Sequence, residues 1–489
     1  MSLNNLPVEW SIQKFEKIVF KIVGGGTPSK NNPEYYLGNI PWMSVKDMNK
    51  NILEDTVDHI TQEAIDNSAT NLIPKGTPII ATRMSLGKVV VANFDSAINQ
   101  DLKAIFLDDN IDKNFFVYWY RSQSKLIESL GTGTTVKGIR LEVINNLDFP
   151  VVPLAEQQEI VRQLDVMLAQ VEQIKARLDA IPAILKKFRQ SVLAEAVSGK
   201  LTEDWRAQNS SSYSAISDHS KIIEDRIRVV KGKNSKPEQH LKNEEYLIPD
   251  SWLWTSLDTL TSKIVDGTHH TPTYIESGVP FISVKDIYDG RIDFSNTKYI
   301  SEEEHKELSK RCNVEKGDLL ITKSGTIGRT AIVTEDREFS LFVSVALLKP
   351  ASSEVNLKFI NLALQKWVNE IDVSSRIVGS AIKNLHLKDM RVLAIPFAPL
   401  KEQEVIVDNI ETFFKLADHL EDVIASAQKR VNLLTQSILA KAFSGELTAE
   451  WREQHQELIT GVNSAESLLA KIQAEREASK PVKKAKKVK

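Results

Sequence analysis

The sequence contains few of the residues that hold disulfide-rich or metal-bound domains together. Of its 489 residues only one is a cysteine, Cys312. A single cysteine cannot form an internal disulfide bond, and it offers no cysteine cluster for a structural zinc ion. We therefore expect Cys312 to be a small, partly buried residue without a chemical role.

Long apolar runs are also absent. The longest apolar stretches, such as residues 78–80 and 341–348, are far shorter than the roughly 20 residues that span a membrane. The first residues, MSLNNLPVEW, lack the basic and apolar regions of a secretory signal. These features lead us to expect a soluble, cytoplasmic protein that does not bind a membrane.

A strong charge of one sign is the third missing feature. The chain has 62 basic and 65 acidic residues, a net charge of -3. Because domains that bind nucleic acids are often strongly basic, any DNA contact must be local. Basic residues gather in segments 221–242 and 480–489, which we expect to be mobile and solvated, with specific recognition as the alternative.

The chain does contain an internal repeat, on a composition that is ordinary for globular proteins, with 42% hydrophobic and 26% charged residues. Residues 133–206 align without a gap with residues 379–452, and 22 of the 74 positions are identical. Upstream, NLPVEWSIQKFEKI (5–18) matches LIPDSWLWTSLDTL (247–260) at both Pro and Trp. The segments between these anchors align less well, because insertions and deletions separate the two copies.

Each copy contains a long amphipathic helix. After the motifs PLAEQ and PLKEQ, apolar residues recur in four-three alternation from Ile160 to Val192 and again from Ile406 to Ile438. This spacing is typical of a coiled coil, and the other copy is the simplest partner. We expect the two stripes to be buried against each other, Pro182 to kink the first helix, and Gly199 and Gly445 to end the helices.

The remaining segments combine short β-branched runs, turn signals and amphipathic stretches, which predicts α+β domains. We place a first globular domain at residues 1–152, a spacer helix at 153–200 and a linker at 201–244. The second copy follows, with a globular domain at 245–398, a spacer helix at 399–446 and a C-terminal region at 447–489.

Catalytic and metal-binding patterns are weak. Asn32-Pro33-Glu34-Tyr35 has an acid where a methyltransferase loop has a second proline, and GTIGRT (325–330) lacks the Gly-Lys of a phosphate loop. His269 and His270 have no accompanying cluster of carboxylates or cysteines. We therefore expect no catalytic residues, no metal site and no enzyme that works alone.

The repeated motifs carry a specific resemblance. PLAEQQEIV, SVLAEAVSGKLTEDWR, their second copies and the two LPxxW-like openings resemble the specificity subunit of type I restriction-modification systems. The resemblance covers essentially the whole chain in the correct order. It implies two target-recognition domains, two conserved helices that form an antiparallel coiled coil, and approximate twofold symmetry.

The resemblance also implies partners. A subunit of this kind binds double-stranded DNA and assembles with two methyltransferase subunits, which bring S-adenosylmethionine, and two restriction subunits, which bring ATP and Mg. The subunit itself would bind no cofactor and catalyse nothing. Because the two globular segments differ, we expect an asymmetric target of two half-sites around an unread spacer.

The comparison of the two copies suggests which residues contact DNA. Basic positions kept in both copies are candidates for the DNA backbone, and positions that differ inside similar loops are candidates for base reading; for each, an exposed, solvated side chain is the alternative. The backbone candidates are Lys46 with Lys285, Lys88 with Arg329, and Lys137 with Lys383. The base-reading candidates are Lys30, Arg83 and Met84 in the first copy and His269, His270, Lys323 and Ser324 in the second.

The residues after the helix ends, Trp205, Arg206, Trp451 and Arg452, are candidates for binding the methyltransferase subunits. Local capping and packing is the alternative for all four. Two other functions remain open at this point: a single-chain fusion of recognition and methylation, and a coiled-coil scaffold that does not read DNA.

Overall fold

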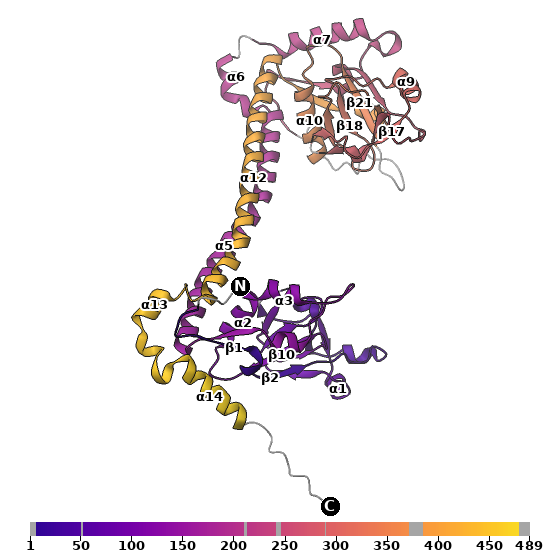
Figure 1. Ribbon diagram of the computed structural model, residues 1–489. Coiled ribbons are helices and arrows are strands. Elements are labelled where there is room, and N and C mark those ends of the chain that lie inside the picture. The colour runs from indigo at the N-terminus through magenta and orange to yellow at the C-terminus, as the bar shows by residue number, and fades with distance from the viewer. Residues whose placement is uncertain are drawn as a thin grey trace, which may run out of the picture. The chain divides into compact units, whose positions relative to one another are not determined.

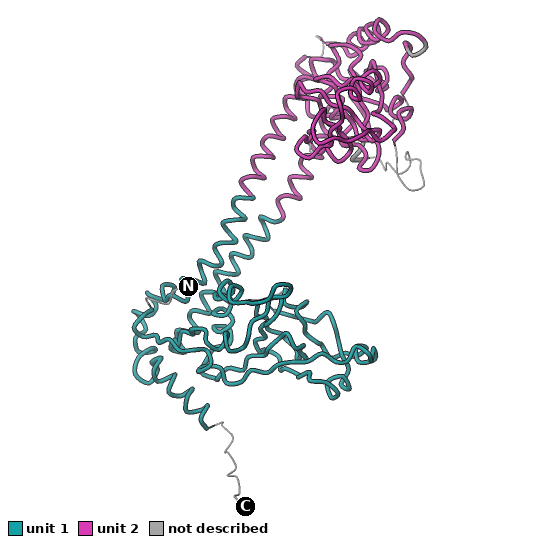
Figure 2. The backbone as a smooth tube through the Cα atoms, turned by 45° about the vertical axis from the view of Figure 1, so that its right-hand side comes forward, with its two compact units in different colours: residues 1–179, 425–489 teal, residues 180–424 magenta. Residues whose placement is uncertain are grey.

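The computed structural model describes residues 6–49, 52–209, 213–240, 246–288, 290–370 and 385–478 (Figure 1). The chain divides into two compact units, each considered by itself below (Figure 2). Unit 1 comprises residues 1–179 and 425–489, and unit 2 comprises residues 180–424. Both units are α+β, as expected.

Unit 1 contains a five-stranded sheet in the order β2-β10-β7-β8-β4 and a four-stranded sheet in the order β5-β3-β9-β6. All four residues of β7 are buried, which explains its continuous apolar run. A separate antiparallel pair joins β1 to β11. The strands are β1 (Ser11–Lys14), β2 (Val19–Gly24), β3 (Ile40–Met43), β4 (Ile52–Leu53), β5 (Asp58–Ile60), β6 (Asn71–Ile73), β7 (Pro78–Ala81), β8 (Val89–Ala92), β9 (Ser96–Ile98), β10 (Leu102–Leu107) and β11 (Asp148–Val151).

Unit 2 repeats this plan with the same number of strands in smaller sheets, and its short strands β15 and β16 form a separate pair. Its larger sheet has the order β13-β21-β18-β19, its smaller sheet has the order β17-β14-β20, and β12 pairs with β22 as β1 pairs with β11. The repeat predicted from sequence is therefore a repeat of topology. The strands are β12 (Leu253–Ser256), β13 (Thr261–Asp266), β14 (Val279–Ile282), β15 (Ile287–Tyr288), β16 (Arg291–Ile292), β17 (Lys298–Ile300), β18 (Leu319–Thr322), β19 (Thr330–Ile332), β20 (Ser340–Leu341), β21 (Val345–Pro350) and β22 (Ala394–Phe397).

Each unit also contains shorter helices. Unit 1 has α1 (Gln62–Asp66), α2 (Lys113–Ser122), α3 (Ser124–Leu130), α4 (Leu141–Asn145), α13 (Ala449–Gln454) and α14 (Ala465–Ala478). Unit 2 has α6 (Glu203–Asn209), α7 (Ala215–Val229), α8 (Leu257–Leu260), α9 (Glu302–Arg311), α10 (Leu357–Glu370) and α11 (Leu387–Arg391).

The two long helices predicted from the apolar spacing are α5 (Leu154–Val197) and α12 (Leu400–Phe443), each of 44 residues. Pro182 lies inside α5 and does not end it. Gly199 and Gly445 follow the helix ends with φ of 80° and 82°, the left-handed conformation that glycine adopts without strain. Within the described part of the chain, neither these nor the shorter helices have the length and apolarity needed to cross a membrane.

The long helices run antiparallel in each unit. In unit 1, Ile160 and Leu164 of α5 share a core with Leu439 and Phe443 of α12. In unit 2, Val192 of α5 shares a core with Ile406 and Ile410, and Arg189 forms an ion pair of 2.7 Å with Asp418. Later residues of α5 therefore contact earlier residues of α12.

The expected burial of the whole apolar stripe is wrong for part of its length. Val171, Leu185, Ala417 and Ile424 are buried, but several intervening stripe residues stay at least one-third exposed: Met167, Ile174, Leu420 and Leu434. Two helices packed as a pair cover only a narrow seam, so the residues at its margins remain in contact with solvent.

The segment expected to be a linker is partly ordered. Residues 215–229 form α7, and its Arg226 is only 1% exposed. The Arg226 guanidinium donates to the carbonyl of Asp258 at 2.9 Å and pairs with the Asp258 carboxylate at 3.1 Å. The interpretation of residues 221–242 as a mobile, solvated stretch is therefore wrong for its helical part, because a buried ion pair holds α7 to unit 2.

The C-terminal region contains α14, which packs into the core of unit 1. Ala465, Leu468 and Ile472 of α14 lie in the same core as Phe115 and Trp119 of α2. The predicted basic tail, residues 480–489, lies outside the described residues.

Candidate functional site

A buried carboxylate joins three distant segments of unit 1. Glu156, in the PLAEQ motif at the start of α5, has no exposed surface. It accepts hydrogen bonds from the indole Nε1 of Trp10 at 2.8 Å, the hydroxyl of Thr448 at 2.7 Å and the guanidinium Nε of Arg452 at 3.0 Å. We call these four residues the first clasp. It fixes the start of the first globular domain and the end of α12 to the start of α5.

Unit 2 contains the same arrangement, which we call the second clasp. Glu402 accepts from Trp252 Nε1 at 2.9 Å, from the Thr202 hydroxyl at 2.7 Å and from the Arg206 guanidinium at 2.6 Å. In both clasps the arginine also donates to the carbonyl of the glycine that ends the helix. The clasps thus account for the residues repeated in PLxEQ, LPxxW and SGxLTxxWR.

A close contact between glycine and proline completes each clasp. A Cβ atom on Gly199 would lie 2.5 Å from Cγ of Pro249, and one on Gly445 would lie 2.3 Å from Cγ of Pro7. Side-chain carbons cannot approach so closely. Both the left-handed conformation and this contact therefore require glycine at the helix ends.

The four residues predicted to bind a partner have different environments. Arg206 and Arg452 belong to the clasps, so local packing accounts for them. Trp205 and Trp451 lie outside the clasps and are half-buried, with Trp205 stacked on Tyr213 and Trp451 stacked on His455 at 4.6 Å between ring centroids. The two tryptophans retain surface that the clasps do not use and that a partner could contact.

Three predicted DNA-contacting residues of the first copy lie together. The backbone N–H of Met84 donates to the carbonyl of Lys137 at 3.0 Å, and Arg83 forms an antiparallel bridge with Gly138. The side chains of Arg83, Met84 and Lys137 are exposed. Met84 has a φ of 62°, the only left-handed residue other than glycine among the described residues. Strained backbone of this kind is concentrated at binding sites.

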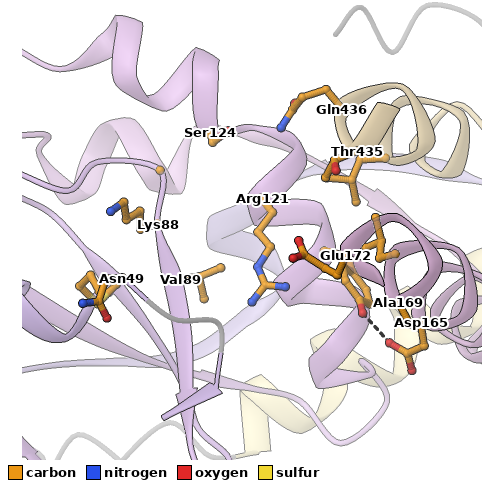
Figure 3. A pocket seen from close by; sticks show the side chains of 15 residues that line it. Asn49, Lys88, Val89, Arg121, Ser124, Asp165, Ala169, Glu172, Thr435 and Gln436 are labelled. Atoms are coloured by element: carbon orange, nitrogen blue, oxygen red, sulfur yellow. Dashed lines mark hydrogen bonds between the residues drawn. The ribbon is translucent and has the colours of Figure 1, made fainter. Parts of the chain in front are cut away.

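Lys88 lies at the end of the same turn and lines a cleft of about 420 Å³. Figure 3 shows Arg121 of α2 reaching into this cleft, with Lys88 and Asn49 on one side and Glu172 of α5 on the other. Burial lowers the pKa of the Arg121 guanidinium, which remains a cation. Because Asp165 and Glu172 also line the cleft, it carries both signs of charge and does not form a simple anion site.

Lys46 and Lys285 occupy equivalent turns. In the SVKD sequences, Asp47 accepts from the backbone N–H of Ser44, and Asp286 accepts from that of Ser283, both at 2.8 Å. These capping boxes explain the serine and the aspartate but leave both lysines exposed. Lys46 pairs with Asp58 at 2.9 Å, and Lys30 lies exposed in the loop after β2.

The candidates of the second copy are arranged differently. His269 and His270 have exposed side chains, whereas Lys323 is 4% exposed and its ammonium pairs with Asp266 at 2.9 Å. Lys323 is therefore not presented to solvent as Arg83 is; it aligns with the buried Thr82 of the first copy, and Arg83 aligns with Ser324. Burial acts to raise the pKa of the Asp266 carboxyl, but Lys323 and His269 outweigh this effect and lower it.

The other second-copy candidates lie near the turn after β18. Ser324 is half-buried, and Arg329 is exposed and donates to the carbonyl of Ile287 at 3.3 Å. Gly325 and Gly328 have positive φ, and residues 325–328 of the GTIGRT segment form a turn. Lys383 lies outside the described residues. The part of the chain that the structure describes contains no grouping of three or more His, Cys, Asp or Glu side chains suited to a metal.

Several important residues were not singled out from sequence. Glu156 and Glu402 were visible as identical residues of the repeat, but their role depends on contacts with segments at least 146 residues away. Asp266 and Arg311 carry no local signal, because the fold alone brings the end of β13 to the end of α9.

Comparison with known proteins identifies relatives over most of the chain. A family model described as the type I restriction modification DNA specificity domain matches residues 7–183 and 270–426. The type I restriction enzyme EcoBI specificity subunit of Escherichia coli is 37% identical over 375 residues, which cover 76% of this chain and 73% of that protein. The EcoDI specificity subunit of Escherichia coli is 30% identical over 497 residues, which cover 98% of each.

Solved structures show the same fold. The HsdS subunit from Thermoanaerobacter tengcongensis matches with a TM-score of 0.55 at 17% identity, covering 90% of this chain and 98% of that chain. A chain from a study of complex assembly and conformational transition in the type I R-M system matches with a TM-score of 0.65 at 18% identity, covering 90% and 99%.

Proposed function

The chain belongs to the family of type I restriction-modification DNA specificity subunits, and we propose that it reads an asymmetric DNA site made of two half-sites. Membership establishes a DNA-recognition role in a type I system and a non-catalytic component of the complex. The match to EcoDI over 98% of both chains disfavours a fusion of recognition and methylation, and the family assignment disfavours a scaffold that does not read DNA.

The observation that carries the proposal is that the two units share the same clasp and the same long helices but differ in their loops. Both units hold an α+β domain to the long helices through the same clasp, which is the geometry expected for two readers of one kind. The aligned loops differ, with exposed Arg83 in unit 1 where unit 2 has the half-buried Ser324. Different side chains offer different donors and acceptors to base edges, so the two half-sites should differ in sequence.

The spacer between the half-sites follows from the helices. At about 1.5 Å per residue, 44 residues make a rod of roughly 65 Å. Readers on the same face of a duplex lie one helical turn, about 34–36 Å, or a multiple apart. Helix length would therefore set the number of unread base pairs.

Backbone contacts would come from the basic positions shared by the two copies. Lys46, Lys88, Lys137, Lys285 and Arg329 are exposed, which supports this role, and we include Lys383 from the sequence. Such contacts position the protein on any duplex, whereas Lys30, Arg83, Met84, His269, His270 and Ser324 would contribute to sequence reading. Lys323 is buried, so it would contribute to sequence reading through its ion pair with Asp266.

The complex would contain two methyltransferase subunits, which bring S-adenosylmethionine, and two restriction subunits, which bring ATP and Mg. Repetition of the clasps supports paired partners, since each clasp places one half-buried tryptophan, Trp205 or Trp451, beside a helix end. The family assignment supports the kind of partner and its DNA substrate.

The proposal is tested by co-expressing the full chain with the methyltransferase subunit of its own system and sequencing the methylated adenines of the host genome. We expect one motif with two unlike half-sites and a spacer of constant length. Methylation without a bipartite motif, or at a palindromic motif, would contradict the proposal.

A further inference from the structure

Two basic side chains and a histidine surround Asp266 at the end of β13 in unit 2. The carboxylate is buried, and its Oδ2 pairs with the Lys323 ammonium at 2.9 Å. Its Oδ1 pairs with a terminal guanidinium nitrogen of Arg311 at 2.5 Å and with Nε2 of His269 at 3.3 Å. One carboxylate therefore contacts three side chains. Arg311 ends α9, His269 lies in the loop after β13, and Lys323 lies in the turn after β18.

The three side chains differ in exposure. The Lys323 side chain is 5% exposed, whereas those of Arg311 and His269 are 56% and 63% exposed. Lys323 compensates the buried negative charge from inside, and the same carboxylate holds the side chains of Arg311 and His269 at the surface. This division of roles follows the two oxygens, because Oδ2 contacts Lys323 and Oδ1 contacts the two outer groups.

We propose that Arg311 is a base-reading residue of the second half-site and that Asp266 is its positioning residue. This inference rests on the proposed DNA-reading function. Arg311 uses one terminal nitrogen on Asp266, which leaves its other N–H donors on an exposed guanidinium. Two such donors match the O6 and N7 acceptors of guanine in the major groove, so the expected ligand is a guanine edge. Holding the guanidinium in advance reduces the conformational entropy lost on binding.

The first copy lacks an acid at the position of Asp266. Gly24, the last residue of β2, is equivalent to Asp266, the last residue of β13. The glycines that follow show this equivalence: a Cβ on Gly25 would lie 1.9 Å from the carbonyl oxygen of Ile98, and one on Gly267 would lie 1.9 Å from that of Leu341. Unit 1 has no carboxylate at this position, and its exposed Arg83 is instead paired with the buried Asp101 at 3.3 Å. An acid at the end of this strand is therefore a feature of the second copy alone.

The test compares four full-length variants, Arg311→Ala, Asp266→Gly, Asp266→Asn and Lys310→Ala, each assembled with the methyltransferase subunit, by selection of bound duplexes from a randomised library. Arg311→Ala should reduce discrimination at one guanine of the second half-site by about ten- to a hundredfold and leave the first half-site unchanged. Asp266→Gly, which places the residue of the first copy in the second, should reduce the same discrimination. Lys310→Ala is the matched control, because Lys310 is the neighbouring cation of α9 and pairs with Glu307 at 2.6 Å.

The outcomes separate this inference from the proposed function. If Arg311→Ala weakens binding to all sequences equally, or leaves the selected motif unchanged, Arg311 does not read a base. If Arg311→Ala behaves as expected while a folded Asp266→Asn variant keeps full discrimination, the positioning role of Asp266 is wrong. Absence of any selected motif with the unsubstituted chain would instead contradict the proposed function.

Discussion

Trp252 donates its indole N–H to Glu402, 150 residues later in the chain, at 2.9 Å. Trp10 and Glu156 repeat this contact in unit 1 at 2.8 Å. Each bond joins the first residues of a globular domain to the first turn of a long helix. Each domain is thereby held to the helices by a buried polar network in addition to apolar packing.

The clasps predict large, localised effects of charge removal. Glu402→Ala leaves Arg206 without its carboxylate and should lower the free energy of unfolding by about 3–5 kcal/mol, because breaking one side of a buried pair leaves the other charge uncompensated. Hydrogen exchange should rise in segments 199–206 and 249–252 and stay unchanged in 7–10 and 445–452. Glu156→Ala should give the reverse pattern, and a uniform rise in either variant would argue against separate clasps.

Trp451 and Arg452 are adjacent, but their substitution by alanine should have different effects on assembly and on the melting temperature. Trp451→Ala removes half-buried surface outside the clasp and should weaken assembly with the methyltransferase subunit while changing the melting temperature by only a few degrees. Arg452→Ala opens the clasp and should lower the melting temperature more. Titration by analytical ultracentrifugation, with calorimetry on the same samples, checks both. Unchanged assembly of Trp451→Ala would assign this tryptophan to local packing.

Lys137 and Arg83 provide a second matched pair, because both are exposed and lie in contacting segments. Lys137→Ala should weaken binding to all sequences and reduce the slope of log affinity against log salt by about one. Arg83→Ala should cost about 1–3 kcal/mol at one half-site only. Binding measured at several salt concentrations, on duplexes that vary each half-site in turn, distinguishes them. Equal effects on every duplex would remove the distinction between backbone contact and base reading.

The spacer should follow helix length. Four residues added to α5 near residue 179 and four added to α12 near residue 424 lengthen the helices by about 6 Å, the rise of roughly two base pairs. Methylated sites should keep both half-sites and gain one or two base pairs between them. A constant spacer in such a variant would disprove the measuring role of the helices.

His219 should make the stability of unit 2 depend on pH. Burial lowers the pKa of this imidazole, whose Nε2 lies 2.8 Å from the hydroxyl of Thr255. The unfolded chain, with a pKa of about 6.5, therefore binds the proton more readily than the folded chain. The free energy of unfolding should fall as pH decreases below about 6.5, and His219→Gln should reduce this fall. Identical pH profiles for both proteins between pH 5 and 8 would refute the assignment.

Much of the fold was predictable because the repeat and the apolar spacing are encoded locally. The long helices, their glycine ends and the paired α+β domains follow from residues close in sequence. The clasps were not predictable in detail, because Trp10 and Arg452, which both donate to Glu156, lie near opposite ends of the sequence. Lys323 was assigned to base reading from its loop position, and its burial depends on Asp266, which approaches from another strand.

The division of the chain also has a consequence for its synthesis. Unit 2 is one continuous segment, residues 180–424, whereas unit 1 needs residues 425–489 to complete its core and its clasp. At a synthesis rate of about 5–20 residues per second, roughly 10 to 50 s pass between synthesis of the first domain and synthesis of the segment that completes it. Unit 2 can fold during that interval. Loss of the last residues of α12 and of α13 would thus leave the core of unit 1 incomplete and leave unit 2 intact. This holds even though the first domain of unit 1 is synthesised before unit 2.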